Sequence, residues 1–145
     1  MKQRLISWNV NGIRAALKKG FLDWLHAESA DIICVQETKA RPEQVEQRLR
    51  NPEGWHASWF SAEKKGYSGV ATFSRTAPLS VKTGLGDAKF DCEGRVIESE
   101  FPDFTLFNVY FPNGGQGPHR VRYKLEFYDA LLKHCSGLRA QGTKV

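Results

Sequence analysis

The sequence predicts a mixed α/β (α+β) fold, and two observations support this prediction. The apolar run Ile32-Ile33-Cys34-Val35 follows Asp31 and is typical of a short strand that is buried on both faces. Amphipathic segments precede and follow this run, as in a parallel βαβ unit. Open α/β sheets bind ligands at the carboxyl ends of their strands, so functional residues are expected where the predicted strands end.

Length and composition fit a single folded domain over residues 1–145. Hydrophobic residues make up 41% of the chain, enough for a core, and no apolar run approaches the roughly 20 residues of a membrane helix. The first residues lead directly into a predicted strand rather than a signal-peptide core, so we expect a cytoplasmic protein with no membrane partner. Three cysteines without metal-type or redox-type spacing argue against a zinc site. The formal net charge of +5 suits a polyanionic partner without requiring one.

Two predicted strands end in polar side chains that suit a metal site. The first strand covers Arg4 to Trp8 and ends at Asn9, and the apolar strand ends at Gln36 and Glu37. If these strands are parallel neighbours joined by a right-handed crossover, Asn9 and Glu37 emerge at the same edge of the sheet. Glu37 is therefore the first candidate for a functional carboxylate.

Helical patterns follow both strands. The pattern over Gly12 to Ala27 predicts helix with a break at Gly20. Arg14 lies off the apolar stripe and close to the end of the first strand, so it is either a solvated surface charge or a phosphate contact. A further helix is expected to begin at Pro42 and to end at Asn51-Pro52.

Two strand pairs are predicted in the middle of the chain. The first joins Trp55–Ser61 to Gly69–Ser74 through a loop whose Tyr67 and lysines form either an ordinary polar tip or a grip on a nucleic-acid backbone. A polar stretch from Thr83 to Gly94 follows. Arg95, by itself a surface charge, then opens a hairpin whose second strand ends at Tyr110.

The last predicted helix follows a loop, Phe111 to Pro118, that is rich in glycine and proline. Its apolar stripe ends near Ser136-Gly137, and Arg120 and Lys124 lie around its first turns. Cations at a helix N-terminus interact unfavourably with the macrodipole. A bound anion would offset this small cost. The residues Thr143-Lys144-Val145 are expected to begin another strand.

Five short motifs occur in order along the chain. They are Ser7-Trp8-Asn9-Val10-Asn11-Gly12-Ile13-Arg14-Ala15, Gln36-Glu37-Thr38-Lys39, Gly66-Tyr67-Ser68-Gly69-Val70-Ala71, Glu93-Gly94-Arg95-Val96-Ile97 and Val109-Tyr110-Phe111-Pro112-Asn113. Together they resemble the exodeoxyribonuclease III family of abasic-site (AP) endonucleases, within the endonuclease/exonuclease/phosphatase superfamily. The first and third motifs favour the DNA-repair branch over the lipid phosphatases.

The resemblance implies the N-terminal half of a four-layer αββα sandwich. It also implies a metal-dependent phosphodiesterase that cuts DNA 5′ to abasic sites and trims 3′ ends. The implied cofactor is Mg²⁺, with Mn²⁺ as an alternative, and a carboxylate such as Glu37 is the hard oxygen ligand that Mg²⁺ prefers. The implied partner is duplex DNA with abasic sites or 3′ ends, bound by an enzyme that is monomeric when complete.

The resemblance also assigns roles to residues. Glu37 matches the metal-ligand carboxylate, and Asn9 matches a ligand or a residue beside one. Tyr110 matches the active-site tyrosine, and since an unperturbed tyrosine has a pKa of about 10, a hydrogen-bond donor is favoured over a phenolate nucleophile. Asn11 matches an outer-sphere group at a position where relatives can have Asp, and Asn113 matches a phosphate contact. The matches for DNA-backbone or helix-start contacts are Arg14, Tyr67, Arg95, Arg120, Tyr123 and Lys124.

Length is the main departure from the family. Relatives continue just past the position of Val145 to a Gly-Asp-X-Asn motif and, near their C-terminus, to an Asp-His pair that completes the site. We therefore expect an incomplete domain that carries one sheet, leaves an apolar inner face uncovered, and is inactive without its C-terminal half. The alternatives are another phosphodiesterase or phosphatase of the superfamily, a non-catalytic DNA-binding remnant, and a product with no function of its own.

Overall fold

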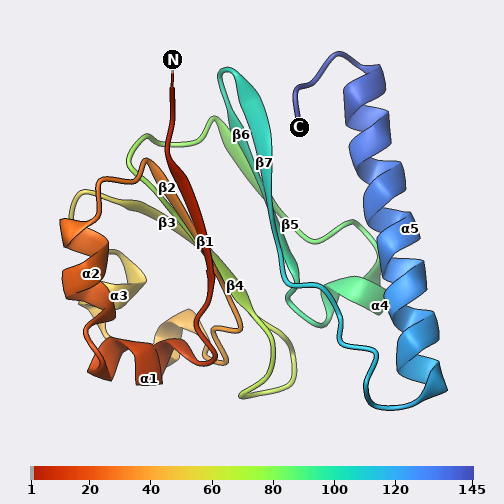
Figure 1. Cartoon of the computed structure of the whole chain (residues 1–145), viewed down its shortest axis with the longest axis horizontal. Helices are drawn as coiled ribbons and strands as arrows, with labels where there is room; N and C mark the ends of the chain where they lie inside the picture. The colour runs from red at the N-terminus through yellow and green to blue at the C-terminus, as the bar shows by residue number, and fades with distance from the viewer. Residues whose placement is uncertain (1) are drawn as a thin grey trace.

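The computed structural model describes residues 2–145 and places two β-sheets between helices (Figure 1). The first sheet has the spatial order β1 (Leu5–Asn9), β2 (Ile32–Gln36), β4 (Val70–Ser74) and β3 (His56–Phe60). The second sheet has the order β5 (Ser80–Thr83), β6 (Val96–Phe101) and β7 (Phe104–Val109). Figure 1 shows the layers from left to right as helices, first sheet, second sheet and helices, which confirms the predicted αββα architecture.

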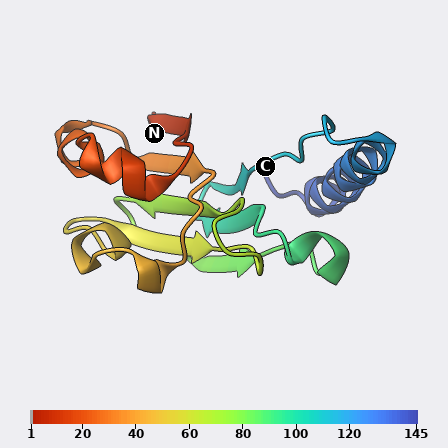
Figure 2. The same cartoon turned by 90° about the horizontal axis from the view of Figure 1, so that it is seen from below.

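The helices lie on the two outer sides of the sheets. Beside the first sheet are α1 (Ile13–Lys18), α2 (Phe21–Ala27), the 3₁₀ turn η1 (Pro42–Gln44) and α3 (Gln47–Arg50). Beside the second sheet are α4 (Ala88–Asp91) and α5 (Pro118–Ala140). Figure 2, seen from below, shows α5 at the opposite end of the molecule from α1 and α2. Among residues 2–145, no helix is long and apolar enough to cross a membrane.

The parallel pairing of β1 with β2 sets the position of the site. Asn9 is the register partner of Gln36, so both strands end at the same level. Gly20 has a positive φ of 98° and separates α1 from α2, as its place in the helical pattern predicted. The predicted common edge for Asn9 and Glu37 is therefore confirmed.

Strand β2 is buried along its whole length because both of its faces are covered. Ile33 and Val35 point into the core that the first sheet shares with its helices. Ile32 and Cys34, on the opposite face, pack with Phe101 of the second sheet. This alternation explains why the sequence shows a continuous apolar run rather than an alternating one.

A buried asparagine joins the two sheets. The side-chain amide of Asn108, on β7, donates to the carbonyl of Ala71 at 2.9 Å and to the hydroxyl of Thr72 at 3.1 Å. Its side-chain oxygen accepts a hydrogen bond of 2.9 Å from the amide of Gln36. Gln36 also donates to Ser7 at 3.0 Å. Because Asn108 is 2% exposed, these bonds fix β7 against the strands of the first sheet.

The expectation that the chain carries only one sheet is wrong. The polar stretch from Thr83 to Gly94 contains α4, and β5 precedes it, so the chain builds a second sheet that packs on the first. Strand β5 was missed because it is short and mostly exposed. Apolar side chains stay exposed on the free edge of β1, where Leu5 and Trp8 are 45% and 40% exposed, and on α5, where Leu125 and Leu132 are 56% and 67% exposed.

Three element boundaries also differ from the prediction. The helix expected from Pro42 is interrupted at Val45, whose backbone is extended. Helix α5 continues through Ser136-Gly137, because a glycine inside a helix costs only about 1 kcal/mol. The last residues do not form a strand, although the carbonyl of Lys144 accepts a 2.8 Å hydrogen bond from the amide of Thr105.

Replacing Asn108 tests its role as the link between the sheets. We expect Asn108→Ala to lower the free energy of unfolding by about 2 kcal/mol, because buried polar groups on β2 and β4 lose their partner. Urea denaturation followed by tryptophan fluorescence measures this change. The exposed Asn51 provides the control, and Asn51→Ala should change the free energy by less than about 0.5 kcal/mol. Equal, small effects of the two substitutions would contradict the assignment.

Candidate active site

Three loops meet at the end of β2. The amide of Gly12 donates to the carbonyl of Glu37 at 2.7 Å, which ties the loop after β1 to the loop after β2. The amide of Thr38 donates to the carbonyl of Gly69 at 3.1 Å, and the amide of Lys39 donates to Ser68 at 2.9 Å. The loop before β4 is thereby tied to the same turn. Glu37 stands where these loops join.

The backbone at this junction is strained. Asn11, Glu37, Lys39 and Ser68 have φ values of 48°, 56°, 52° and 52°, and they are the non-glycine residues with positive φ among residues 2–145. Each such residue costs on the order of 1 kcal/mol and persists only where the surroundings enforce it. The hydrogen bonds between the loops supply that enforcement. Strain of this kind gathers at functional sites, which supports the choice of Glu37.

Gly69 is required by the same junction. Its φ is +90°, and a Cβ atom at this position would lie 2.3 Å from the hydroxyl oxygen of Thr38. Only a residue without a side chain allows the start of β4 to approach the Glu37 turn this closely. The close approach of these two segments therefore explains why the third sequence motif has a glycine at position 69.

The carboxylate of Glu37 is surrounded by three donors. Tyr110 donates to its Oε1 at 2.5 Å, and the Nδ2 of Asn9 donates to the same oxygen at 3.1 Å. The ammonium of Lys39 lies 3.4 Å from Oε2. Burial raises the pKa of Glu37, but these hydrogen bonds and the charge of Lys39 outweigh it, so the pKa lies below its ordinary value of 4.5. Glu37 is therefore ionised at neutral pH.

The two asparagines of the first motif serve this carboxylate differently. The oxygen of Asn9 accepts a 3.0 Å hydrogen bond from the amide of Asn11, so its amide nitrogen faces Glu37. This orientation fits a residue beside a metal ligand; direct ligation by Asn9 stays a prediction and would require the amide to turn over. The oxygen of Asn11 accepts a 2.7 Å hydrogen bond from Lys39.

Lys39 belongs to the site, although the sequence motifs assign it no role. It lies two residues after Glu37, and its ammonium lies 3.4 Å from the Glu37 carboxylate. The sequence signal was its place in the second motif. Its ammonium neutralises Glu37 and supplies a cation beside the position of any phosphate bound there.

Tyr110 reaches Glu37 from the end of β7. Burial and the hydrogen bond to the negative Glu37 raise the pKa of Tyr110 to about 12. The phenol is therefore protonated at pH 7 and can only act as a donor or be deprotonated at high cost. This result favours the predicted hydrogen-bond role over a phenolate nucleophile.

Arg95 lies in a buried cluster behind Tyr110, and its interpretation as a surface charge is wrong. Its side chain is 2% exposed. The guanidinium donates to Glu93 at 2.7 Å, to the carbonyl of Tyr110 at 3.0 Å and to the hydroxyl of Tyr67 at 2.9 Å. Arg120 contacts the same Glu93 and Tyr67. A direct DNA contact by Arg95 is not supported by this placement, because all three guanidinium nitrogens already face protein acceptors.

The contacts of three further predicted residues, Arg14, Asn113 and Lys124, involve groups other than Glu37. Arg14 is exposed and donates to the carbonyl of Lys39 at 3.2 Å, so it borders the site. Asn113 is exposed in the loop before α5, where its oxygen accepts from the amide of Gly115 at 2.8 Å. Lys124 lies on α5 with its ammonium 5.5 Å from the ring centre of Tyr128. Their roles in DNA binding stay predictions.

The donor set fits one hard divalent cation bound through few protein ligands. Among residues 2–145, no three His, Cys, Asp or Glu side chains are arranged to hold a metal. Mg²⁺ does not need such a group, because it keeps several waters and binds through one or two carboxylates together with substrate phosphate. The side chain of Glu37 is 19% exposed, so it can reach a hydrated ion. Glu37 is the residue that would hold the metal.

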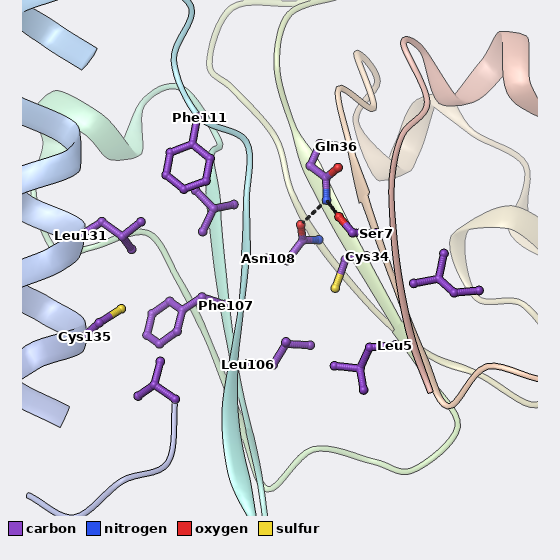
Figure 3. A pocket seen from close by; sticks show the side chains of 13 residues that line it. Leu5, Ser7, Cys34, Gln36, Leu106, Phe107, Asn108, Phe111, Leu131 and Cys135 are labelled. Atoms are coloured by element: carbon purple, nitrogen blue, oxygen red, sulfur yellow. Dashed lines mark hydrogen bonds between the residues drawn. The ribbon is translucent and has the colours of Figure 1, made fainter. Parts of the chain in front are cut away.

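A groove of about 500 Å³ lies between β1 and β7 (Figure 3). Figure 3 shows the pair Gln36 and Asn108 on its wall, surrounded by apolar side chains from β1, β7 and α5. These side chains include Leu5, Leu106 and Leu131, and Phe111 from the loop after β7 joins them. None of the predicted site residues lines the groove, and its apolar surface does not suit a phosphate backbone.

The two packed sheets with helices on both outer sides define the class of protein, which is that of the αββα sandwich proteins. The model of the Endonuclease/Exonuclease/phosphatase family matches residues 6–145. The chain therefore belongs to this family. Nucleases of the family generally depend on a divalent metal.

Two of the similar proteins are named as DNA nucleases. The chain is 48% identical over 132 residues to "Exodeoxyribonuclease" of Bacillus subtilis and 46% identical over 140 residues to "DNA repair nuclease APEX1" of Danio rerio. These matches cover 90% and 95% of this chain but 51% and 45% of the relatives. The chain thus spans about half the length of the curated relatives it matches.

Solved structures give the same relationship. The APE2 catalytic domain of Xenopus laevis superposes with a TM-score of 0.81 at 31% identity, over 95% of this chain and 55% of that chain. The 3′ phosphatase NExo from Neisseria, bound to a product DNA hairpin, superposes with a TM-score of 0.82 at 28% identity, over 96% of this chain and 53% of that chain.

Removing the Tyr110 hydroxyl tests the electrostatics of Glu37. We expect Tyr110→Phe to raise the pKa of Glu37 toward 4.5, because one of the hydrogen bonds that oppose the effect of burial is lost. An NMR titration of the Glu37 carboxyl carbon measures the change, and Tyr128→Phe, on the exposed face of α5, is the control.

The same titration has a consequence for stability. Because the pKa of Glu37 is lowered in the folded chain, its ionisation stabilises the fold above pH 4.5, and this contribution is lost as the pH falls through the folded value. Tyr110→Phe should narrow the pH interval between the pKa of Glu37 in the folded chain and 4.5, because it raises the folded value. An unchanged Glu37 titration in Tyr110→Phe would refute the proposed contact.

Proposed function

We propose that this chain is part of a DNA-repair nuclease that hydrolyses phosphodiester bonds 5′ to abasic sites and trims 3′ ends of duplex DNA, with Mg²⁺ or Mn²⁺. The observation that carries the proposal is the ionised Glu37, held by Tyr110 and Asn9 at the ends of both sheets. The names of the relatives from Bacillus subtilis and Danio rerio support the choice of DNA over a lipid or soluble phosphoester.

The side chains around Glu37 divide the work of binding a phosphodiester. A divalent ion held by Glu37 would stabilise charge on the phosphate and on the leaving 3′ oxygen. Tyr110 is protonated, and its single O–H would donate to a phosphate oxygen in place of Glu37 once the carboxylate holds the ion. The ammonium of Lys39 lies beside the carboxylate and provides a further positive charge for the same phosphate.

Activation of the attacking water requires a base in addition to these residues. Glu37 is unsuitable for this role, because its lowered pKa makes it a weak base and its carboxylate is the proposed ligand of the metal. We propose that the base comes from the other half of the fold, so that residues 1–145 alone do not cut DNA. The complete enzyme is proposed to act as a monomer.

An incision assay tests the function. The substrate is duplex DNA with one abasic site, in Mg²⁺, and the protein is the 145-residue chain mixed with the C-terminal half of the Bacillus subtilis relative. We expect incision by the mixture and none by the chain alone. Glu37→Gln should reduce the rate by about 100-fold or more, because the metal and phosphate lose their anchor.

The matched control is Glu46→Gln, which removes a carboxylate from the exposed ion pair with Arg48 and should leave the rate unchanged. Robust incision by the chain alone that disappears in Glu37→Gln would contradict the need for an external base. Equal cleavage of intact and abasic duplex by the mixture would instead indicate another phosphodiesterase of the superfamily. Salt-sensitive DNA binding without cleavage by the mixture would indicate a binding remnant.

A further inference from the structure

Behind Tyr110 lies a cluster of charged and phenolic side chains that does not touch Glu37 directly. Its centre is the carboxylate of Glu93, whose side chain is 16% exposed. Glu93 accepts hydrogen bonds from Arg95 at 2.7 Å and from the two terminal nitrogens of Arg120 at 3.0 and 3.2 Å. One carboxylate thus holds two guanidinium groups.

Arg95 connects this carboxylate to Tyr110 through several contacts. One guanidinium nitrogen donates to the carbonyl of Tyr110 at 3.0 Å, and the amide of Tyr110 donates to the carbonyl of Arg95 at 2.9 Å. The guanidinium carbon also lies 5.0 Å from the centre of the Tyr110 ring. Both the backbone and the ring of Tyr110 therefore depend on the position of Arg95.

We propose that Glu93 is a positioning residue that fixes Tyr110 against Glu37 by holding the buried guanidinium of Arg95. Without Glu93, the charges of Arg95 and Arg120 would lie near each other with no carboxylate between them. A buried charge without a counter-charge is strongly destabilising, so Arg95 would turn toward water. Tyr110 would then lose the contacts that hold its hydroxyl on Glu37.

The turn that carries Glu93 is built to keep this arrangement. Gly94 has a φ of +59°, and a Cβ atom there would lie 2.4 Å from the backbone nitrogen of Ala62. The amide of Glu63 also donates to the carbonyl of Cys92 at 2.9 Å. The turn is thus packed against the end of β3, which places Glu93 and Arg95 beside the loop that carries Tyr67.

The role of Glu93 can be tested without DNA or metal. The result of this test is therefore independent of the result of the incision assay that tests the proposed function. The 145-residue chain is labelled with ¹³C at the ring carbon that bears each tyrosine hydroxyl, and the Tyr110 signal is assigned with Tyr110→Phe. Glu37→Gln gives the reference displacement for a Tyr110 hydroxyl that has lost its charged acceptor. We expect Glu93→Gln to move the Tyr110 signal in the same direction, whereas Glu46→Gln should leave it in place.

A merely structural role of Glu93 predicts a different result. In that case Glu93→Gln would lower the unfolding temperature, but the Tyr110 signal of the folded protein would not move, and the proposal would be overturned. If Glu93→Gln does not fold, Glu93→Asp retains the charge with a shorter reach and should still displace the signal. A folded Glu93→Asp variant with an unmoved Tyr110 signal would also overturn the proposal.

Discussion

The hydrogen bond between Tyr110 and Glu37 is the contact on which the site depends. Glu37 belongs to the turn after β2, and Tyr110 follows β7, so the bond forms only when the two sheets are packed in the correct relative position. Two residues earlier on β7, Asn108 fixes that position through its buried bonds to the first sheet. The same strand thus supplies both the structural link and the tyrosine of the site.

The surroundings of the site compensate for its backbone strain and for its buried charge. Glu37 and Lys39 adopt positive φ values, which the backbone bonds between three loops enforce. Behind Tyr110, a buried arginine is tolerated because Glu93 and two other oxygen acceptors satisfy it. The result is a carboxylate that is ionised, accessible from one side and fixed on the other. Such preorganisation is what binding of a hydrated cation and a phosphate requires.

Much of this arrangement could be predicted from the sequence because local patterns determine it. The buried run before Glu37 and the strand before Asn9 were enough to place both side chains at one sheet edge. The second sheet was not predicted, because β5 is short and exposed and α4 lies in a polar stretch without periodicity. The burial of Arg95 was not predictable either, since its acceptors come from Tyr67, Glu93 and Tyr110, which only the tertiary fold brings together.

Paramagnetic line broadening by Mn²⁺ is the most direct test of Glu37 as the metal site. Mn²⁺, which resembles Mg²⁺ in its preference for oxygen ligands, is added to the labelled chain at substoichiometric amounts. We expect the amide signals of Asn9, Glu37 and Lys39 to broaden first, and this selective broadening to disappear in Glu37→Gln. Broadening that centres on another part of the chain, or that is the same in Glu37→Gln, would contradict the central role of this carboxylate.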